Sequence, residues 1–118
     1  MAREWTFQKT LEPSEVKHVM SSLRIPRKEA NKLIDLLTER QKNMIKNASC
    51  TSINFYDQST GREFIMQLIY NEKNITLLGE TLWGHEIVQK LGLKAGDDIV
   101  LWYKEGHDRL NFNVWRKR

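Results

Sequence analysis

Apolar and polar residues alternate along several short runs of the chain, with the two-residue period of strands buried on one face. The runs are rich in β-branched and aromatic residues, and polar turn residues separate them. They cover residues 4–8, 51–56, 63–70, 75–78, 99–103 and 110–115. The run at 99–103 is apolar throughout, which favours a strand covered on both faces. In the last run the alternation predicts that Leu110, Phe112 and Val114 point inward.

Two stretches follow the helical period instead. Residues 27–47 place Ala30, Leu33, Ile34 and Leu37 on one face and charged residues opposite, which predicts an amphipathic helix. A shorter helix is predicted from residue 82 to 91. It ends at Gly92, because glycine can adopt a positive φ at little energetic cost. A tight turn is predicted at residues 94–97 before the apolar strand. Near the N-terminus, Ser14 is expected to cap a single helical turn over residues 14–17.

The predicted elements are six or seven short strands and two helices, joined mostly by hairpins. Strands and helices do not alternate as β-α-β-α, so a doubly wound sheet is excluded. A partly open antiparallel barrel with helices at its ends fits the pattern. At 118 residues, the chain is expected to form one domain over residues 1–118.

The composition limits the cellular compartments in which the protein is expected. The sequence has no run of about 18 apolar residues, so no membrane span is expected, and the first residues lack the apolar segment of a secretory signal. The single cysteine, Cys50, cannot form an internal disulfide, which suits a reducing compartment. Without an export signal, the two sequons at Asn47 and Asn74 are interpreted as chance. The expected location is the cytosol or the nucleus.

The net charge of +4 is unevenly distributed. Residues 1–48 carry ten Lys and Arg against six Asp and Glu, and residues 102–118 carry five against two. The middle of the chain, residues 49–101, carries four against seven. A basic amino-terminal half and a basic tail favour an anionic partner such as nucleic acid.

Catalytic patterns are missing from the sequence. The three histidines and Cys50 are far apart and have no metal-ligand spacing. Neither a nucleophile elbow nor a phosphate-binding glycine loop occurs. Asp97 and Asp98 could bind a cation, but a turn aspartate that accepts hydrogen bonds from local amides is the favoured interpretation. We therefore expect a binding protein and no enzyme, metal or cofactor.

Two separated motifs resemble the plant B3 DNA-binding domain. The first is Lys9-x-Leu11-x-x-Ser14-Glu15-Val16 followed by Leu-Arg-Ile-Pro-Arg-Lys at 23–28, similar to the family's Lys-x-Leu-x-x-Ser-Asp-Val and Leu-x-Ile-Pro-Lys. The second is Gly-Leu-Lys-Ala-Gly-Asp at 92–97 before an apolar strand, as near the end of the family's domain. The motifs occur in the family's order and spacing and together span about three-quarters of the chain.

The resemblance implies a mainly β fold with short helices, a seven-stranded open antiparallel pseudobarrel capped by two helices. It also implies a plant nuclear transcription factor domain that binds double-stranded DNA specifically, without a membrane, cofactor or small-molecule substrate. Because the family's first helix is shorter, the helix predicted at 27–47 is expected to be broken, or extended by an insertion, around residues 38–42.

In the family, two loop arms enter the major groove. In this sequence the first arm corresponds to Lys9–Lys28, and the second arm lies between Ile69 and Leu82. Cationic side chains suit phosphates, Arg24 suits a guanine edge, and asparagine suits adenine. The residues expected to contact DNA are Lys9, Lys17, His18, Ser21, Ser22, Arg24, Arg27, Lys28, Tyr70, Asn71, Lys73, Asn74 and Thr76.

The chain departs from the family pattern in the second arm. Where the family commonly has Lys-Gly-Trp before the helix, this chain has Gly-Glu-Thr-Leu-Trp at 79–83. The carboxylate of Glu80 near a phosphate would weaken binding. A protein-interaction module on the same barrel, with weak or lost DNA affinity, therefore remains an alternative.

Aromatic residues leave a further alternative open. Trp5, Trp83, Trp102 and Trp115 could stack on single-stranded bases, as in small nucleic-acid-binding barrels. Their places in strand and helix patterns favour core packing for all four. The basic end, residues 115–118, is expected to be a frayed terminus, with a loose phosphate contact or a weak nuclear address as alternatives.

Overall fold

The computed structural model describes residues 3–17, 21–71, 74–78 and 82–118, with the backbone alone at 74–78 and 82. Every strand predicted from the alternation is present. The elements are β1 (Glu4–Thr10), η1 (Pro13–Glu15), β2 (Leu23–Pro26), α1 (Arg27–Leu36), α2 (Glu39–Ala48), β3 (Cys50–Asp57), β4 (Arg62–Tyr70), β5 (Asn74–Leu78), η2 (Leu82–Gln89), β6 (Asp98–Lys104) and β7 (Leu110–Arg116).

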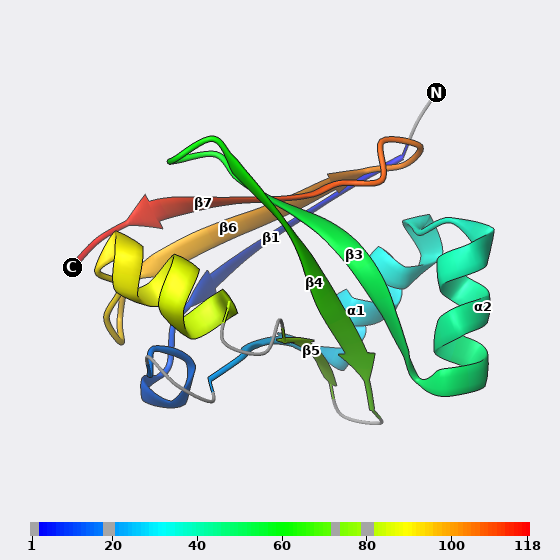
Figure 1. Ribbon diagram of the computed structural model, residues 1–118, viewed down its shortest axis with the longest axis horizontal. Helices are drawn as coiled ribbons and strands as arrows, with labels where there is room; N and C mark the ends of the chain where they lie inside the picture. Colours follow the sequence, from blue (N-terminus) through cyan, green and yellow to red (C-terminus); the bar gives the residue numbers. More distant parts are fainter. Residues whose placement is uncertain (1–2, 18–20, 72–73, 79–81) are drawn as a thin grey trace.

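Seven strands form one sheet in the order β1-β6-β7-β3-β4-β5-β2. In Figure 1, β1, β6 and β7 run together and β3 and β4 cross them, so the sheet folds over on itself. Because β1 and β2 remain as edges, the barrel is open. The prediction of an antiparallel sheet is wrong at one pair, since β3 and β7 are parallel, with Phe55 opposite Leu110. These strands are not connected by a turn, so no local hairpin signal reports their pairing.

The helix predicted at 27–47 is broken, as expected from the family resemblance. Leu37 is extended, and the Oγ1 of Thr38 accepts a hydrogen bond from the backbone N of Gln41 at 3.2 Å. The Oε1 of Gln41 accepts in return from the backbone N of Thr38 at 3.0 Å, which completes a capping box and starts α2. The predicted number of helices, two, is too low, because the described residues form α1, α2, η1 and η2.

The core lies between the two crossed halves of the sheet. Trp83, Tyr103, Phe55 and Phe112 are the largest fully buried side chains among the described residues. The ring of Phe112 lies 5.5 Å from that of Phe55 and 5.9 Å, edge to face, from that of Trp83. Aromatic pairs at this spacing stabilise a core beyond the area that they bury. Trp83 therefore fastens η2 onto β7.

Strand β6 is buried on one face only. Ile99, Leu101 and Tyr103 point into the core, whereas Val100 and Trp102 are half-buried on the other side. The prediction of a strand covered on both faces is wrong, because an apolar run does not reveal whether a second layer is present. On β7, Leu110 and Phe112 are buried and Val114 is partly buried, as predicted.

The tryptophans divide between the core and the surface. Trp5 and Trp83 are buried, Trp102 is half-buried on the face of β6 that points away from the core, and Trp115 is 58% exposed, so the prediction of core packing is wrong for Trp102 and Trp115. The chain after it is also not frayed. The backbone N of Arg118 donates to Oδ1 of Asp97 at 2.7 Å, and the Nζ of Lys117 donates to the carbonyl of Leu91 at 2.8 Å.

No described helix is both long and apolar enough to cross a membrane.

Candidate nucleic-acid interface

The first arm is fixed to the barrel at one buried carboxylate. Glu15 closes η1 and has no exposed surface. Its Oε2 lies 3.1 Å from the Nζ of Lys9 and accepts a hydrogen bond from the backbone N of Arg24 at 2.9 Å. Its Oε1 accepts from the backbone N of Glu12, and its carbonyl accepts from Nε1 of Trp83 at 2.7 Å. Four elements, β1, η1, β2 and η2, therefore meet at Glu15.

The helical turn begins earlier than the sequence suggested. Glu12, not Ser14, is the residue before the turn, and Pro13 occupies its first position, where a fixed φ is favourable. Ser14 lies inside the turn, and its Oγ accepts a hydrogen bond from Nη2 of Arg24 at 2.6 Å. This bond ties the Arg24 side chain to η1, and a guanidinium has further N–H groups with which it can donate to a ligand.

The second sequence motif holds the start of the first arm. Gly96 has a φ of 95°, which a side chain would disfavour, and its N donates to the carbonyl of Leu11 at 2.9 Å. The N of Leu11 donates to the carbonyl of Asp97 at 2.8 Å, and the Leu11 side chain is buried. The carboxylate of Asp97 accepts from the backbone N of Lys94 at 2.8 Å, so the favoured role as a turn aspartate is confirmed.

Several predicted DNA contacts of the first arm are on the surface. Lys17, Arg24, Arg27 and Lys28 are exposed, and Ser22 is half-buried. Arg24 is exposed because Leu23 and Ile25 on either side of it point into the core. Alternation on β2 therefore directs this guanidinium to solvent.

Two predicted contacts of the first arm have structural roles. The side chain of Lys9 is 14% exposed, and its Nζ also donates to the carbonyl of Arg24 at 2.8 Å. Ser21 is 2% exposed, and its hydroxyl donates to the carbonyl of Lys17. In this structure both side chains shape the arm. His18 lies outside the described residues.

The second arm joins β4 to β5. Tyr70 is half-buried against the core, its backbone N donates to the carbonyl of Ser49 at 2.8 Å, and Asn71 is exposed. For Asn74 and Thr76 the structure describes only the backbone, within β5. Lys73 and Glu80 lie outside the described residues, so the expected effect of the Glu80 charge stays a prediction.

The two arms are brought together by strand pairing. β2, which ends the first arm, pairs antiparallel with β5, which follows the turn of the second arm. Arg24 is the register partner of Thr76, and Pro26 is that of Asn74. In Figure 1, η1, β2 and β5 lie along the lower side of the molecule, opposite the β6–β7 turn. The described parts of the two arms thus share one side of the fold.

The described residues contain no group of three or more His, Cys, Asp or Glu placed to hold a metal ion. The described parts of the arms carry cations, amides and hydroxyls.

A family model described as "B3 domain-containing protein At5g26805, C-terminal domain" matches residues 5–115. The chain belongs to the B3 domain family. The resemblance seen in the two motifs is therefore confirmed.

Solved structures agree on the fold. The B3 domain is similar to the "Arabidopsis FUS3-DNA complex", with a TM-score of 0.67 and 19% identity, covering 94% of this chain and 95% of that one. It is also similar to the "hypothetical Arabidopsis thaliana protein At1g16640.1", with a TM-score of 0.62 and 15% identity, covering 98% and 94%. At these identities the likeness shows the fold alone. A comparison with curated protein sequences found no match.

Sequence reasoning missed the junction at Glu15. The family motif marked this position only by its place in a pattern. A charged residue followed by Val16 gives no periodic signal of burial, and Trp83, which donates to the carbonyl of Glu15, lies 68 residues farther along the chain. The spacing of Lys9 from Glu15 in the motif was the one available hint of an ion pair.

The carboxylate of Asp97 predicts an acid sensitivity of the B3 fold. Burial raises the pKa of this carboxyl, but the amides of Arg118 and Lys94 that donate to it, with the nearby Lys94 and Lys117 charges, outweigh burial and hold its pKa below the usual range. A carboxyl whose pKa is lowered by folding stabilises the protein above its unfolded pKa of about 3.9 and loses that contribution as pH falls through the folded value.

Asp97→Asn is therefore expected to have a lower free energy of unfolding than the parent near pH 7. The difference between the two free energies should become smaller below about pH 4. Urea unfolding at a series of pH values measures this. If the free energies of unfolding of parent and variant differ by the same amount at neutral and acid pH, the ionised form of Asp97 is not what stabilises the turn.

Proposed function

We propose that this B3 domain, residues 1–118, binds double-stranded DNA in a sequence-specific manner as part of a plant transcription factor in the nucleus. The two arms contact the major groove, and the barrel serves as their rigid support. Binding, not catalysis, is the activity.

The pairing of β2 with β5 is the observation that carries the proposal. Each strand connects directly to one arm, so the sheet fixes the separation of the arms in the free protein. Strands that are already paired do not have to be ordered when DNA binds, which reduces the entropic cost of association. The buried junction at Glu15 supports the same rigidity.

The charges of the first arm suit this role. Lys17, Arg27 and Lys28 are exposed cations that can neutralise phosphates, which supplies affinity without base preference. Arg24 has a guanidinium that is positioned by Ser14, and a fixed fork can make two hydrogen bonds to guanine. The similar fold that was solved as a FUS3–DNA complex adds support from a relative that holds DNA.

The test begins with selection of duplexes from a random pool, followed by fluorescence anisotropy across salt concentrations. Lys17→Ala is expected to weaken binding to all duplexes alike and to reduce the salt slope by about one. Arg24→Ala is expected to lose about 1–3 kcal/mol of discrimination at one base pair. The unequal effects separate a phosphate contact from a base contact.

Lys104→Ala is the matched control, because Lys104 is an exposed cation near the β6–β7 turn, on the opposite side of the molecule. Its duplex affinity should equal that of the parent. If Lys17→Ala and Arg24→Ala also bind like the parent, the arms are assigned wrongly. A parent protein that binds no selected duplex would leave the protein-interaction module as the better function.

A further inference from the structure

The outer face of the β1-β6-β7 half of the sheet, which points away from the core, carries a row of aromatic and polar side chains. Strand alternation directs Thr6 of β1, Trp102 of β6 and Asn111 of β7 to this face, and these residues are register neighbours. None of the three is fully buried. We call this surface the outer face.

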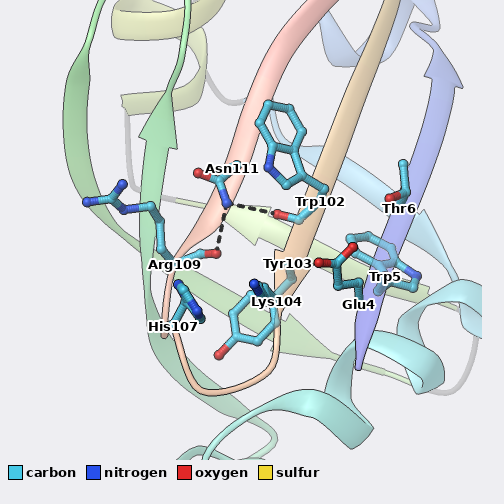
Figure 2. Close-up of a pocket in the computed structure, with 9 residues that line it drawn as sticks. All are labelled: Glu4, Trp5, Thr6, Trp102, Tyr103, Lys104, His107, Arg109 and Asn111. Carbon is cyan, nitrogen blue, oxygen red and sulfur yellow. Dashed lines mark hydrogen bonds between the residues drawn. The ribbon is translucent and has the colours of Figure 1, made fainter. Parts of the chain in front are cut away.

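One end of the outer face is a concave surface of about 560 Å³ next to the β6–β7 turn. Figure 2 shows the indole of Trp102 standing beside Asn111, with Lys104, His107 and Arg109 nearby. The Nδ2 of Asn111 donates to the carbonyls of Trp102 at 3.3 Å and Arg109 at 3.4 Å, which fixes the amide next to the ring.

The other end is a second concave surface, of about 340 Å³, that includes Trp115 with Gln8, Thr10 and Arg116. Trp115 is 58% exposed although the chain on both sides of it is held in place. The tail is anchored through Asp97, and β7 is paired with β6 up to Arg116. An exposed indole on a fixed backbone is a preformed platform for a flat ligand.

We propose that the outer face binds single-stranded nucleic acid, with Trp102 and Trp115 as stacking platforms. Base–aromatic stacking combined with cations along a polar surface is the general mode by which small barrels hold single strands. Here cations lie at both ends, with Lys104 and Arg109 near Trp102, and Arg116 near Trp115.

The spacing of the two indoles suits several nucleotides. Trp102 is opposite Asn111, and Trp115 lies four residues farther along β7, beside a register shift, so the backbone positions of the two residues are at most about 13 Å apart at about 3.3 Å per residue. A stacked strand rises about 3.4 Å per nucleotide, which gives about four nucleotides across this distance. Small barrels engage about 4 to 16 nucleotides.

The carboxylates on this face do not dominate its charge. Asp98 accepts a hydrogen bond from Oγ1 of Thr10, and its carboxylate lies 3.1 Å from the guanidinium of Arg118. The negative charge of Asp98 is therefore compensated by Arg118. Near Trp102, Glu4 is opposite Lys104 in the register, and the carboxylate of Glu63 lies 3.6 Å from Nε of Arg109. Protein partners are less suited, because polar residues such as Asn111 and Asn113 flank the half-buried Val100 between the two indoles.

The experiment uses fluorescein-labelled oligothymidylate of about 15 nucleotides, a length within the range of small barrels. Anisotropy at low salt measures affinity, and quenching of intrinsic tryptophan fluorescence reports stacking. Trp115→Ala is expected to weaken binding about 5- to 100-fold, and Trp115→Phe to retain most of it. Trp102→Leu, which keeps an apolar side chain, is expected to weaken binding similarly.

Two cation variants separate this surface from the arms. Lys104→Ala should weaken oligothymidylate binding and leave duplex binding unchanged, whereas Lys17→Ala should do the reverse. The proposal is overturned if oligothymidylate does not bind, or if a Trp102→Leu, Trp115→Ala double variant binds it like the parent. Displacement of oligothymidylate by oligoglutamate at equal charge would also overturn it, since a site for any polyanion needs no stacking. Because duplex binding is measured separately, the oligothymidylate result can be interpreted even if the domain does not bind duplex DNA.

Discussion

Glu15→Ala is expected to lower the free energy of unfolding by about 3 kcal/mol and to abolish specific duplex binding. Removing one partner of a buried ion pair costs about 3–5 kcal/mol, because the other charge stays without compensation. The lower end applies because the ammonium of Lys9 is partly exposed and retains the carbonyl of Arg24 as an acceptor. The variant also leaves the backbone N–H groups of Glu12 and Arg24 without their acceptors. Urea denaturation measures the loss.

Glu39→Ala is the control for this prediction, since the Glu39 side chain is 87% exposed and lies 3.7 Å from Lys42 in an ordinary surface pair. Its unfolding free energy should change by less than about 0.5 kcal/mol. Glu15→Gln keeps the shape and one acceptor oxygen, so its stability should fall between those of the parent and Glu15→Ala. A Glu15→Ala protein as stable as the control would show that the first arm is held by other contacts.

Trp83→Ala is expected to cost about 3–5 kcal/mol, the range for removing a large buried aromatic side chain. The indole is fully buried against Phe112, and its Nε1 donates to the carbonyl of Glu15 at 2.7 Å. Trp83→Phe keeps most of the ring but leaves this buried carbonyl unpaired, which costs about 1–3 kcal/mol. Thermal and urea unfolding measure both losses.

Trp115→Ala provides a matched control, because that indole is mostly exposed and its removal should change stability by less than about 0.5 kcal/mol. If Trp83→Phe equals the parent in stability and in duplex affinity, the bond between η2 and Glu15 does not fix the first arm. If Trp83→Phe loses as much as Trp83→Ala, the hydrogen bond outweighs the packing of the ring.

The positions of most strands in the sequence could be predicted from periodicity, since alternation is a property of neighbouring residues. The six strands predicted in this way are all present, and the broken helix at Leu37 and Thr38 was expected from the shorter family helix. The Gly-Asp motif was equally readable, because a turn with a positive φ at Gly96 limits which residues can occupy it.

Pairings between distant elements could not be read in the same way. The parallel contact of β3 with β7 and the pairing of β2 with β5 depend on how the sheet closes, which no local pattern encodes. Lys9 and Ser21 are polar residues of the kind that contact ligands at a surface, yet packing of η1 and β2 covers most of the Lys9 side chain and buries Ser21. Trp115 is an aromatic residue of the kind that fills cores, yet among the described residues it is 58% exposed on β7.

By itself, the sequence determined which segments become strands and helices, where the turns lie, and that the chain is a B3 domain, because these depend on local periodicity and on short motifs. The tertiary structure alone decided that β2 pairs with β5, that Glu15 joins four elements, and that two indoles lie on the outer face of the sheet. Those features depend on which distant segments pair and on which side of each strand remains uncovered, and both are set by closure of the whole sheet.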